Sequence, residues 1–478
     1  MKAMIWSLSW KNIWRNKLRS SIVIAAITIG LFGGIFAAAV MVGMGEQRLH
    51  SAIHNEVSHI QIHHPKFSEN QEMKYTIDDY GNIEDSIREL NGVKSVTSRI
   101  NITAMARTAN NATGVTVLGV NPEQEKTTTE ICTKIPDGGG TYLDTNVHNA
   151  IFIGEELARD LNIVSFKLTQ DVFDQLAEAD IDNENITKLQ SLRGKLFRKE
   201  NRFDDSLRNK LGRKTYSEIE SFVKETSIIY NLRKKIVLTF QSADGNLTGG
   251  AFRVTGVYDI NNTAFERTHV FVRRNELQEL TGLSGNKVHE MAVLLNDIET
   301  DNKVAAQISN LVPDLKVQLW KDLSPNLKVV TSMMDFFMFI FLIIILLALG
   351  FGIVNTMLMA VLERMKELGM LMAVGMNKKR VFSMIMLETI FLSMTGAIAG
   401  MIISYLLILY TGNVGMDLSS LYKQGFESLG YSAVLYPELG AKFFLEVTGL
   451  VILTAIIASL YPAKKALSLR PAEALRTE

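Results

Sequence analysis

The chain has 478 residues, about three times the length of a typical domain, so we expect more than one structural unit. Its 50 basic and 50 acidic side chains cancel to a formal net charge of zero, which argues against a nucleic-acid-binding protein with a broad positive surface. The hydrophobic content of 47% is ordinary for a soluble protein, but it includes four long segments that are almost continuously apolar.

These four apolar segments are each long enough to cross a membrane as a helix. They cover roughly residues 20–45, 336–362, 381–410 and 443–463, and a helix of about 20 residues spans about 30 Å of hydrocarbon. A polar region of ordinary globular composition separates the first segment from the second. The sequence therefore predicts an α-helical membrane protein with four transmembrane helices plus a large α+β extracytoplasmic domain of two lobes.

The first span also has features of a secretion signal. Residues 36–40, FAAAV, resemble a signal-peptidase site after a basic segment, and cleavage there would leave three spans. The uncharged run continues to Gly45, which is longer than the apolar part of a signal peptide. We therefore expect an uncleaved helix.

Basic residues flank the spans unevenly. They precede the first span, separate the second from the third and follow the fourth, whereas the loop 411–441 has only Lys423. Because cytoplasmic loops carry the excess of Lys and Arg, we expect both termini and residues 363–380 in the cytoplasm. The predicted location is thus the bacterial inner (plasma) membrane, with several passes.

The domain boundaries follow from the ends of the spans. In chain order we predict an amphipathic interfacial helix (1–19), transmembrane helix 1 (20–45), the extracytoplasmic domain (46–327), transmembrane helix 2 (328–362), a cytoplasmic helix and loop (363–380), transmembrane helix 3 (381–410), an extracytoplasmic loop (411–441), transmembrane helix 4 (442–463) and a cytoplasmic tail (464–478). The highly charged segment at about 166–233 reads as an inserted helical arm, with disorder as the alternative.

Three of the four tryptophans lie on one stripe of the first helix. Trp6, Trp10 and Trp14 are spaced by four residues, and cations occupy another side. This pattern predicts a helix in the membrane plane with its rings at the level of the lipid headgroups. The alternative is that the stripe packs on another subunit.

The sequence offers little catalytic chemistry. Gly194–Lys195 is followed by Leu196, and residue 189 is leucine where a phosphate-binding loop needs glycine, so we expect neither an ATP site nor any cofactor on this chain. His50 and His54 have the spacing of two metal ligands on a helix, but no HExxH motif or paired carboxylates accompany them. We interpret them as surface or interface histidines and predict no metal site, no catalytic residue and no enzyme activity.

Two features of the third predicted span concern its packing. Glu388 is an intramembrane polar residue and hence a functional candidate, but its position near the cytoplasmic end favours a structural pairing with the basic flank. GAIAG, residues 396–400, is a GxxxG step that favours close helix packing.

Residues 363–375 predict a short amphipathic helix below the spans. Leu362, Met365, Leu368 and Met372 recur every three or four residues, while the charged residues point elsewhere. The charged face carries both signs, which favours a protein groove over anionic lipid. The alternative is an ordinary loop helix on the lipid surface.

Residues 355–382, NTMLMAVLERMKELGMLMAVGMNKKRVF, resemble the cytoplasmic segment of the FtsX-like permease family. The matching residues are Asn355, Thr356, Glu363, Arg364, Glu367, Leu368, Gly369, Ala373 and Gly375. Residues 461–476, YPAKKALSLRPAEALR, resemble the ending of that family, and residues 10–20, WKNIWRNKLRS, resemble its start.

The resemblance implies an ABC transporter permease of the mechanotransmission type, with a MacB-like periplasmic core domain. It implies a second permease subunit (a homodimer or a heterodimer), cytoplasmic ABC ATPase subunits that hold ATP and magnesium, and contact with membrane lipids. The implied ATPase-docking residues are Glu363, Arg364, Met365, Glu367, Leu368, Gly369 and Gly375. Without an ATPase on the chain, the layout is most similar to that of lipoprotein-releasing Lol permeases.

Three functions are compatible with this resemblance. The first is lipoprotein release or related extrusion from the inner membrane, with a periplasmic lipoprotein carrier or adaptor as partner. The second is export of peptides, drugs or toxins with a periplasmic adaptor. The third is a membrane-tethered regulator of exterior enzymes. The arm at 166–233 departs from the family pattern and leaves the cargo open.

Overall fold

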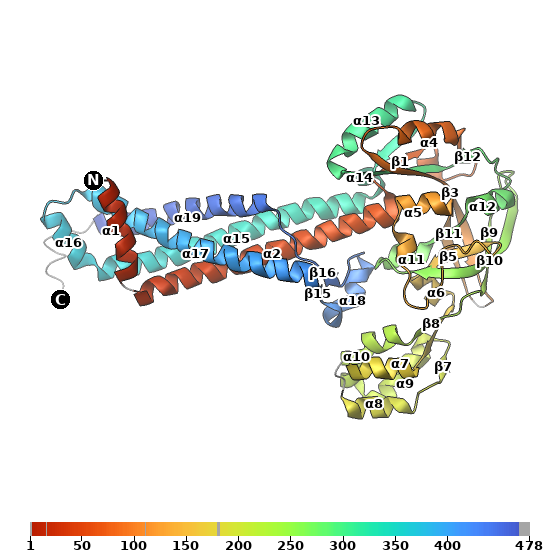
Figure 1. Ribbon diagram of the computed structural model, residues 1–478, viewed down its shortest axis with the longest axis horizontal. Helices are drawn as coiled ribbons and strands as arrows, with labels where there is room; N and C mark the ends of the chain where they lie inside the picture. Colours follow the sequence, from red (N-terminus) through yellow and green to blue (C-terminus); the bar gives the residue numbers. More distant parts are fainter. Residues whose placement is uncertain (1, 16, 110, 179–181, 468–478) are drawn as a thin grey trace. The chain divides into compact units, whose positions relative to one another are not determined.

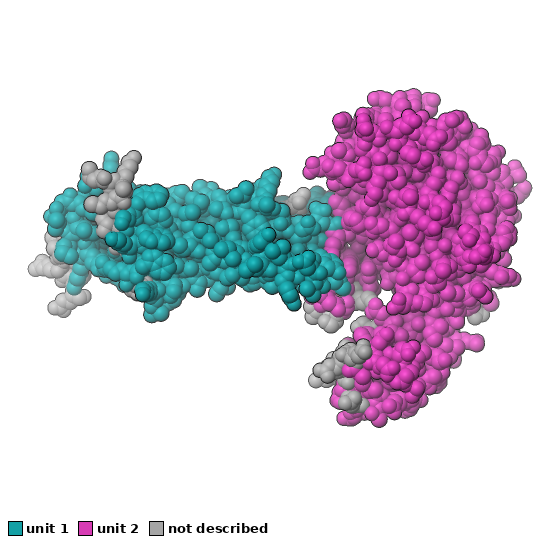
Figure 2. All heavy atoms as spheres, viewed as in Figure 1, with its two compact units in different colours: residues 1–46, 329–416, 434–478 teal, residues 47–328, 417–433 magenta. Residues whose placement is uncertain are grey.

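The computed structural model describes residues 2–15, 17–109, 111–178 and 182–467. The chain divides into two compact units, shown in Figure 2. The helical unit comprises residues 1–46, 329–416 and 434–478, and the α+β unit comprises residues 47–328 and 417–433. Most of the predicted cytoplasmic tail, from residue 468, lies outside the described residues.

The helical unit contains the long apolar helices of the chain (Figure 1). Its elements are α1 (Lys2–Arg15), α2 (Lys17–Ser51), α15 (Pro325–Glu363), α16 (Met365–Ala373), α17 (Lys378–Val414), α19 (Ala441–Leu467) and the short strands β15 (Met416–Asp417) and β16 (Val434–Leu435). Among the described residues, four helices are long and apolar enough to span a membrane, and they contain the four apolar segments of the sequence. The helices extend past the apolar runs because polar residues continue the same backbone hydrogen bonding.

Close packing in this unit depends on the GxxxG step of α17. A Cβ added to Gly396 would lie 2.8 Å from the Ile27 side chain of α2, and one added to Gly400 would lie 3.0 Å from the Thr28 carbonyl oxygen. The Thr28 hydroxyl donates to the Gly396 carbonyl at 3.1 Å. This contact confirms the predicted role of the two glycines in close helix packing.

The α+β unit is built on a nine-stranded sheet that divides into two lobes. Its strands are β1 (Ile60–His63), β3 (Val93–Arg107), β4 (Ala112–Val120), β5 (Ala150–Gly154), β9 (Lys235–Gln241), β10 (Leu247–Tyr258), β11 (His269–Arg273), β13 (Glu290–Leu295) and β14 (Lys316–Leu319), in the order β14-β1-β13-β3-β4-β11-β5-β10-β9. A further pairing of β3 with β9 closes the last six strands into a barrel, and the first three strands with β3 form an open sheet.

Strand β3 belongs to both lobes, and its length makes this possible. Residues 93–99 pair with β13 in the open sheet, and residues 100–107 pair with β4 in the barrel. In the barrel half, Ile100, Ile102 and Ala104 are buried in the same core as Val254 of β10. The alternation of these residues with less buried ones is the period of two of a strand with one face in a core.

Helices cover both lobes. The open sheet packs its core against α4 (Tyr80–Arg88) and α13 (Asp301–Leu311), which contribute Ile87 and Ile308. The remaining elements of the unit outside the insertion are η1 (Ala52–Val57), α3 (Phe67–Asn70), β2 (Ile77–Asp78), α5 (Pro122–Thr128), η2 (Ile131–Thr133), α6 (Glu155–Asp160), α11 (Thr263–Thr268), α12 (Arg274–Thr281), β12 (Lys287–Val288), η3 (Ile298–Thr300), α14 (Trp320–Leu323) and α18 (Ser419–Ser428).

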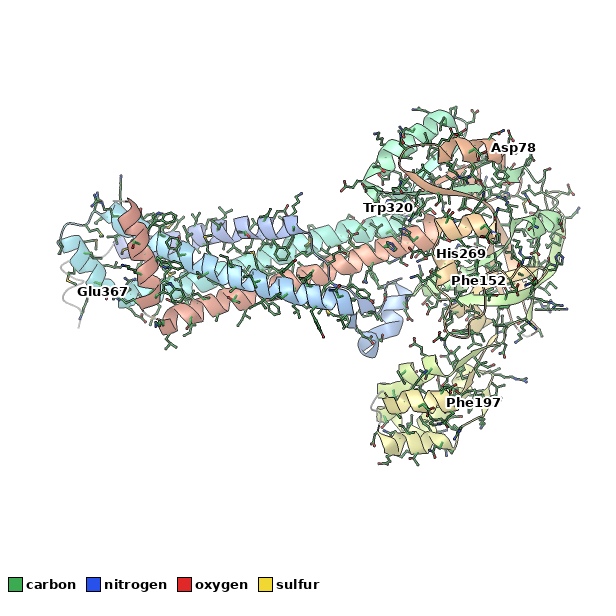
Figure 3. All side chains as sticks on the ribbon, viewed as in Figure 1. Asp78, Phe152, Phe197, His269, Trp320 and Glu367 are labelled. Carbon is green, nitrogen blue, oxygen red and sulfur yellow. The ribbon has the colours of Figure 1, made fainter. Side chains whose placement is uncertain are left out.

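The charged insertion is a small α+β subdomain and not only a helical arm. It contains β6 (Val164–Lys167), α7 (Gln170–Glu178), α8 (Asn183–Gln190), β7 (Leu196–Phe197), α9 (Glu200–Leu211), α10 (Arg213–Thr226) and β8 (Ile228–Tyr230). The strands form a sheet in the order β7-β6-β8. Leu189, Phe203 and Leu207 are fully buried and belong to the same hydrophobic core as the barrel strands, and Figure 3 shows Phe197 in this segment. The described residues of the segment thus form a sheet as well as helices, and the sheet was missed because its strands are two to four residues long.

Candidate docking site on α16

Two local breaks define α16. The long helix α15 ends at Glu363, and Arg364 leaves the helical conformation with φ −101° and ψ 17°. After α16, Gly375 has φ +103°, a conformation that favours glycine, and it turns the chain toward α17. The Asn377 side chain then accepts from the Lys379 backbone N–H at 3.1 Å and caps α17. The sequence ERMKELGMLMAVG is thus a helix held between two turns.

One side of α16 is anchored to the rest of the helical unit by ion pairs. The Arg364 guanidinium donates to both carboxylate oxygens of Glu388 in α17, at 3.0 and 3.1 Å. It also donates to Glu367 at 3.2 Å, and Glu367 accepts a hydrogen bond from Arg15 of α1. Figure 3 shows Glu367 at the end of this unit, where α1 and α16 lie. Glu388, which we predicted to lie in the third span and to pair with basic residues near it, thus pairs with Arg364.

The ionisation of Glu367 follows from these contacts. Partial burial disfavours the carboxylate, but hydrogen bonds from Arg15 and Arg364 outweigh it and lower the pKa of Glu367. Glu367 is therefore charged at neutral pH and connects α1 to the start of α16. The docking residues proposed from the sequence include two, Arg364 and Glu367, that hold the unit together internally.

The apolar stripe of α16 faces inward, so Leu368, one of the implied docking residues, packs within the helical unit. Leu368 is 3% exposed and belongs to the core of the helical unit, and Gly369 is buried beside it. Met365 is half-buried, whereas Glu363 and Gly375 are exposed. The physical reason was available in the pattern, because the apolar stripe of a helix beside a bundle packs on that bundle.

A second, exposed apolar surface lies on the other side of this segment. Met370 is 56% exposed and Val374 is 84% exposed, with Leu371 between them at 37%. We call Met370, Leu371 and Val374 the outer face of α16. Sequence reasoning missed these residues because they do not continue the stripe of Leu362, Met365, Leu368 and Met372.

The tryptophan stripe of α1 lies against α17 and remains partly open. The rings of Trp6 and Trp10 meet Phe391 edge-on, with centroids 5.3 and 5.7 Å apart, and Trp14 contacts Trp10. All three indoles nevertheless keep a large exposed surface. Ile13, which lies beside this stripe on the helix, is fully buried and anchors α1 in the helical unit. The exposed rings stay available for the predicted membrane interface.

The α+β unit has an acidic cleft between the insertion and the barrel. Its volume is about 790 Å³, and nine acidic residues and three basic residues line it: Asp137, Glu155, Glu156, Asp160, Glu200, Glu225, Asp259, Glu266 and Glu427, with Arg159, Lys224 and Arg267. Burial, together with the neighbouring Asp259, raises the pKa of Glu266 to about 9, although two backbone N–H groups donate to it. A cleft with such an excess of carboxylates attracts cationic ligands.

Comparisons with known proteins place the helical part in a family. Residues 339–471 match the FtsX-like permease C-terminal family. A macrolide export ATP-binding/permease protein MacB of Chlorobium luteolum is 32% identical over 27% of this chain and 16% of its own. Permeases of Methanocaldococcus jannaschii and Bacillus subtilis (YknZ), both named as uncharacterized ABC transporter permeases, are 26% and 25% identical and each match about half of either chain.

One solved structure is also similar at a low score. The extracellular domain of the ABC-type transporter YknZ from Gram-positive bacteria aligns over 54% of this chain and 98% of its own, at 12% identity and a TM-score of 0.29. At this score the likeness carries no conclusion, so the fold rests on the strand pairings described above.

The four apolar helices and the α+β unit define a multi-pass membrane protein of the permease class. Residues 339–471 of this chain match the FtsX-like permease C-terminal family, and MacB and YknZ are among the proteins that the chain is similar to. This confirms the resemblance drawn from residues 355–382.

Proposed function

We propose that this chain is the permease subunit of an ABC transporter and that a separate ATPase docks on the outer face of α16. The names of its relatives support the class. The observation that carries the docking site is the two-sided construction of α16. Ion pairs and Leu368 fix its inner side to α1 and α17, and Met370, Leu371 and Val374 remain exposed.

This construction suits the transfer of force. A docking helix that transmits force must be rigidly joined to the spans that it moves, and the Arg364–Glu388 pair joins α16 to α17. It must also offer a partner an apolar centre, since fully desolvated side chains carry most binding energy at interfaces. A pull on α16 would then be passed to α17 as a rigid-body movement. The ATP and magnesium would lie on the partner.

The test replaces one exposed apolar side chain by a charge. Val374→Asp should leave the fold intact, because Val374 is 84% exposed. A buried aspartate at the centre of an interface should cost about 2 kcal/mol or more, which corresponds to about 30-fold weaker binding. The readout is the amount of an ATP-binding subunit, identified by mass spectrometry, that co-purifies with the permease.

The matched control is Val414→Asp, the same change at the other end of α17, where Val414 is 63% exposed. We expect this control to co-purify the ATPase as wild type does. Equal recovery with Val374→Asp would refute docking on the outer face. A double variant with Glu363→Lys and Glu367→Lys would test docking less cleanly, because Glu367 also pairs with Arg15 and Arg364 within the chain.

For the cargo we propose lipoprotein release or related extrusion. Extraction of an acyl chain costs about 0.8 kcal/mol per CH₂ group, so it needs an energy source such as ATP hydrolysis. The second permease subunit, a copy of this chain or a related one, and a carrier on the exterior side complete the proposed assembly. Orientation with both termini in the cytoplasm belongs to this proposal, since the ATPase must reach α16.

Export of small molecules is the second candidate, because the MacB relatives are named as macrolide exporters. Depletion of the protein separates the two. Accumulation of acylated proteins in the membrane that holds this protein supports lipoprotein release, whereas increased drug susceptibility with normal lipoprotein sorting supports export. If depletion causes neither change, both cargo assignments are refuted. The docking test on α16 is independent of that result.

A further inference from the structure

The α+β unit brings three metal-binding side chains together at the end of α2. His50 lies in the last turn of α2, His54 lies in η1, and Glu130 precedes η2. One ligand atom from each lies within 4.8 Å of the other two, and among the described residues this is the one such group of His, Cys, Asp and Glu. The two imidazole rings are stacked with centroids 3.9 Å apart, and His50 Nε2 is 3.9 Å from the Glu130 carboxylate.

We propose that His50, His54 and Glu130 form a binding site for a first-row transition-metal ion of the Zn²⁺ type. Zinc ligands lie about 2.0–2.1 Å from the ion, so tetrahedral ligand atoms are about 3.4 Å apart. The side chains of His50 and Glu130 are 58% and 40% exposed, so small rotations of either are free to close the remaining gap. Solvent supplies the fourth ligand.

The hydrogen bonds around the site prepare it for a metal. His54 Nδ1 lies 3.0 Å from the His50 carbonyl oxygen. Because a carbonyl only accepts, Nδ1 carries the proton and the lone pair is on Nε2. Metal-bound histidines usually have this arrangement, in which the outer nitrogen donates to a carbonyl or a carboxylate. The tautomer that binds a metal through Nε2 is thus already selected.

The backbone at the site is also held in place. The Glu130 backbone N–H donates to the His54 carbonyl at 2.9 Å, which fixes the two segments relative to each other. The π-helical turn η1 that carries His54 is bridged by the Arg48–Glu56 ion pair at 2.7 Å, whose side chains are 11% and 10% exposed. Glu56 also accepts from Asn262 at 2.8 Å. Single π-helical turns are uncommon and occur frequently at functional sites.

The donor set selects the kind of ion. Two imidazoles and one carboxylate suit zinc and neighbouring transition metals, whereas calcium and magnesium prefer oxygen ligands alone. Sequence reasoning assigned no metal here because the third ligand is 76 residues beyond His54. A bound ion would clip the end of α2 to the segment between α5 and η2, which no covalent bond joins.

The experiment uses the full-length protein in nanodiscs after treatment with a chelator. We expect one Zn²⁺ per chain by elemental analysis after dialysis, and Co²⁺ should give the visible absorption of a tetrahedral site. Glu130→Gln and His50→Gln keep the size of each exposed side chain and remove the ligand. Each should weaken Zn²⁺ binding by about 100-fold or more, since even outer-shell changes cost about 10–100-fold.

The control is His148→Gln. His148 is an exposed histidine 3.4 Å from Glu276, so it copies the His–Glu pair outside the group of three ligands. Stoichiometric binding that survives in this control and fails in the other two variants supports the site. Equal loss in all three, no stoichiometric binding by wild type, or unchanged binding by Glu130→Gln would overturn the proposal and leave an ordinary His50–Glu130 ion pair.

A second measurement tests whether a bound ion links the end of α2 to the segment between α5 and η2. Zn²⁺ should slow amide hydrogen exchange in residues 52–57 and 130–133 of wild type, and Glu130→Gln should abolish this protection. Unchanged amide exchange rates in metal-loaded wild type would refute this metal-mediated link. This readout does not require transport activity or an ATPase.

Discussion

Arg99 is the residue on which the stability of the α+β unit should depend most strongly. It lies in β3 at the point where the strand passes from the open sheet to the barrel. Its guanidinium donates to Glu125 at 2.7 and 3.1 Å and to Glu290 at 2.8 Å. The three side chains are only 2–4% exposed, so these are buried, charge-assisted hydrogen bonds.

Replacement of Arg99 by methionine should destabilise this unit by about 3–5 kcal/mol, because two carboxylates would stay buried without their shared cation. That is a large part of the about 5–15 kcal/mol that stabilises a typical domain. A variant with Arg99→Met, Glu125→Leu and Glu290→Leu should recover most of the loss, since an apolar replacement of a buried ion cluster is often neutral. Arg99→Lys should fall between, because an ammonium cannot copy the guanidinium fork.

The assay can observe this unit alone. Of the four tryptophans, Trp320 is buried in the α+β unit and the other three lie in α1. Full-length protein with Trp6, Trp10 and Trp14 changed to phenylalanine therefore reports unfolding of this unit through Trp320 fluorescence. Linear extrapolation of denaturant curves then gives the free energy of unfolding of each variant. A loss below 1 kcal/mol for Arg99→Met would refute the reasoning.

The pH dependence of the free energy of unfolding provides a second, independent test of the Arg99 cluster. Burial opposes ionisation of Glu290, but the Arg99 charge outweighs it and lowers the pKa of Glu290 below its usual 4.5. A depressed pKa contributes stability that is present above pH 4.5 and lost as the pH falls through the folded-state value. In Arg99→Met, burial is opposed only by the smaller effects of His63 and Asn101 and raises the pKa of Glu290, so acidification should stabilise that variant. Equal pH slopes in both proteins would contradict this account.

Two further changes test other parts of the structure. Gly396→Ala should destabilise the helical unit by about 1–3 kcal/mol, because the added methyl group would overpack against Ile27. Gly449→Ala is the control, since a Cβ added there has no atom within contact distance, and it should leave the stability unchanged. Thermal melts of the detergent-solubilised protein compare the two variants. Because the pKa of Glu266 is raised from 4.5 to about 9, wild type should lose stability as the pH rises through that interval, and Glu266→Gln should lack this slope in Trp320 unfolding curves. Parallel curves for Glu266→Gln and wild type would show that Glu266 is ionised in the folded protein.

The sequence predicted well those features that depend on local composition. Apolar runs predict long helices because a membrane span must bury its side chains over about 20 residues, and each run lies inside one long helix. The GxxxG step is equally local, since Gly396 and Gly400 share one face of α17. The short helix after Glu363 was predicted for the same reason, because its period is visible within ten residues.

Features that join distant segments were not predictable in this way. Arg99, Glu125 and Glu290 come from β3, α5 and β13, and no local pattern shows that their charges meet. The closure of the barrel by β3 and β9 likewise depends on pairing Met105–Arg107 with residues 237–239. The two faces of α16 were only partly predictable. The spacing of apolar residues located one apolar stripe, but only the packing of the helices shows which side of α16 faces the bundle.

The position of Arg99 has a mechanical consequence for the proposed function. The open sheet and the barrel share β3, and Arg99 pairs directly with Glu290 at the last residue that β3 gives to the open sheet. A hinge between the two lobes at this point would have to separate Arg99 from Glu290 or Glu125, at a cost of several kcal/mol. Movement of the sheet relative to the barrel is therefore expensive, and a force applied to one lobe is carried to the other. The insertion contributes no strand to the nine-stranded sheet, and its Leu189 and Phe203 belong to the same hydrophobic core as Ile100 and Val254 of the barrel, so apolar packing joins these two parts.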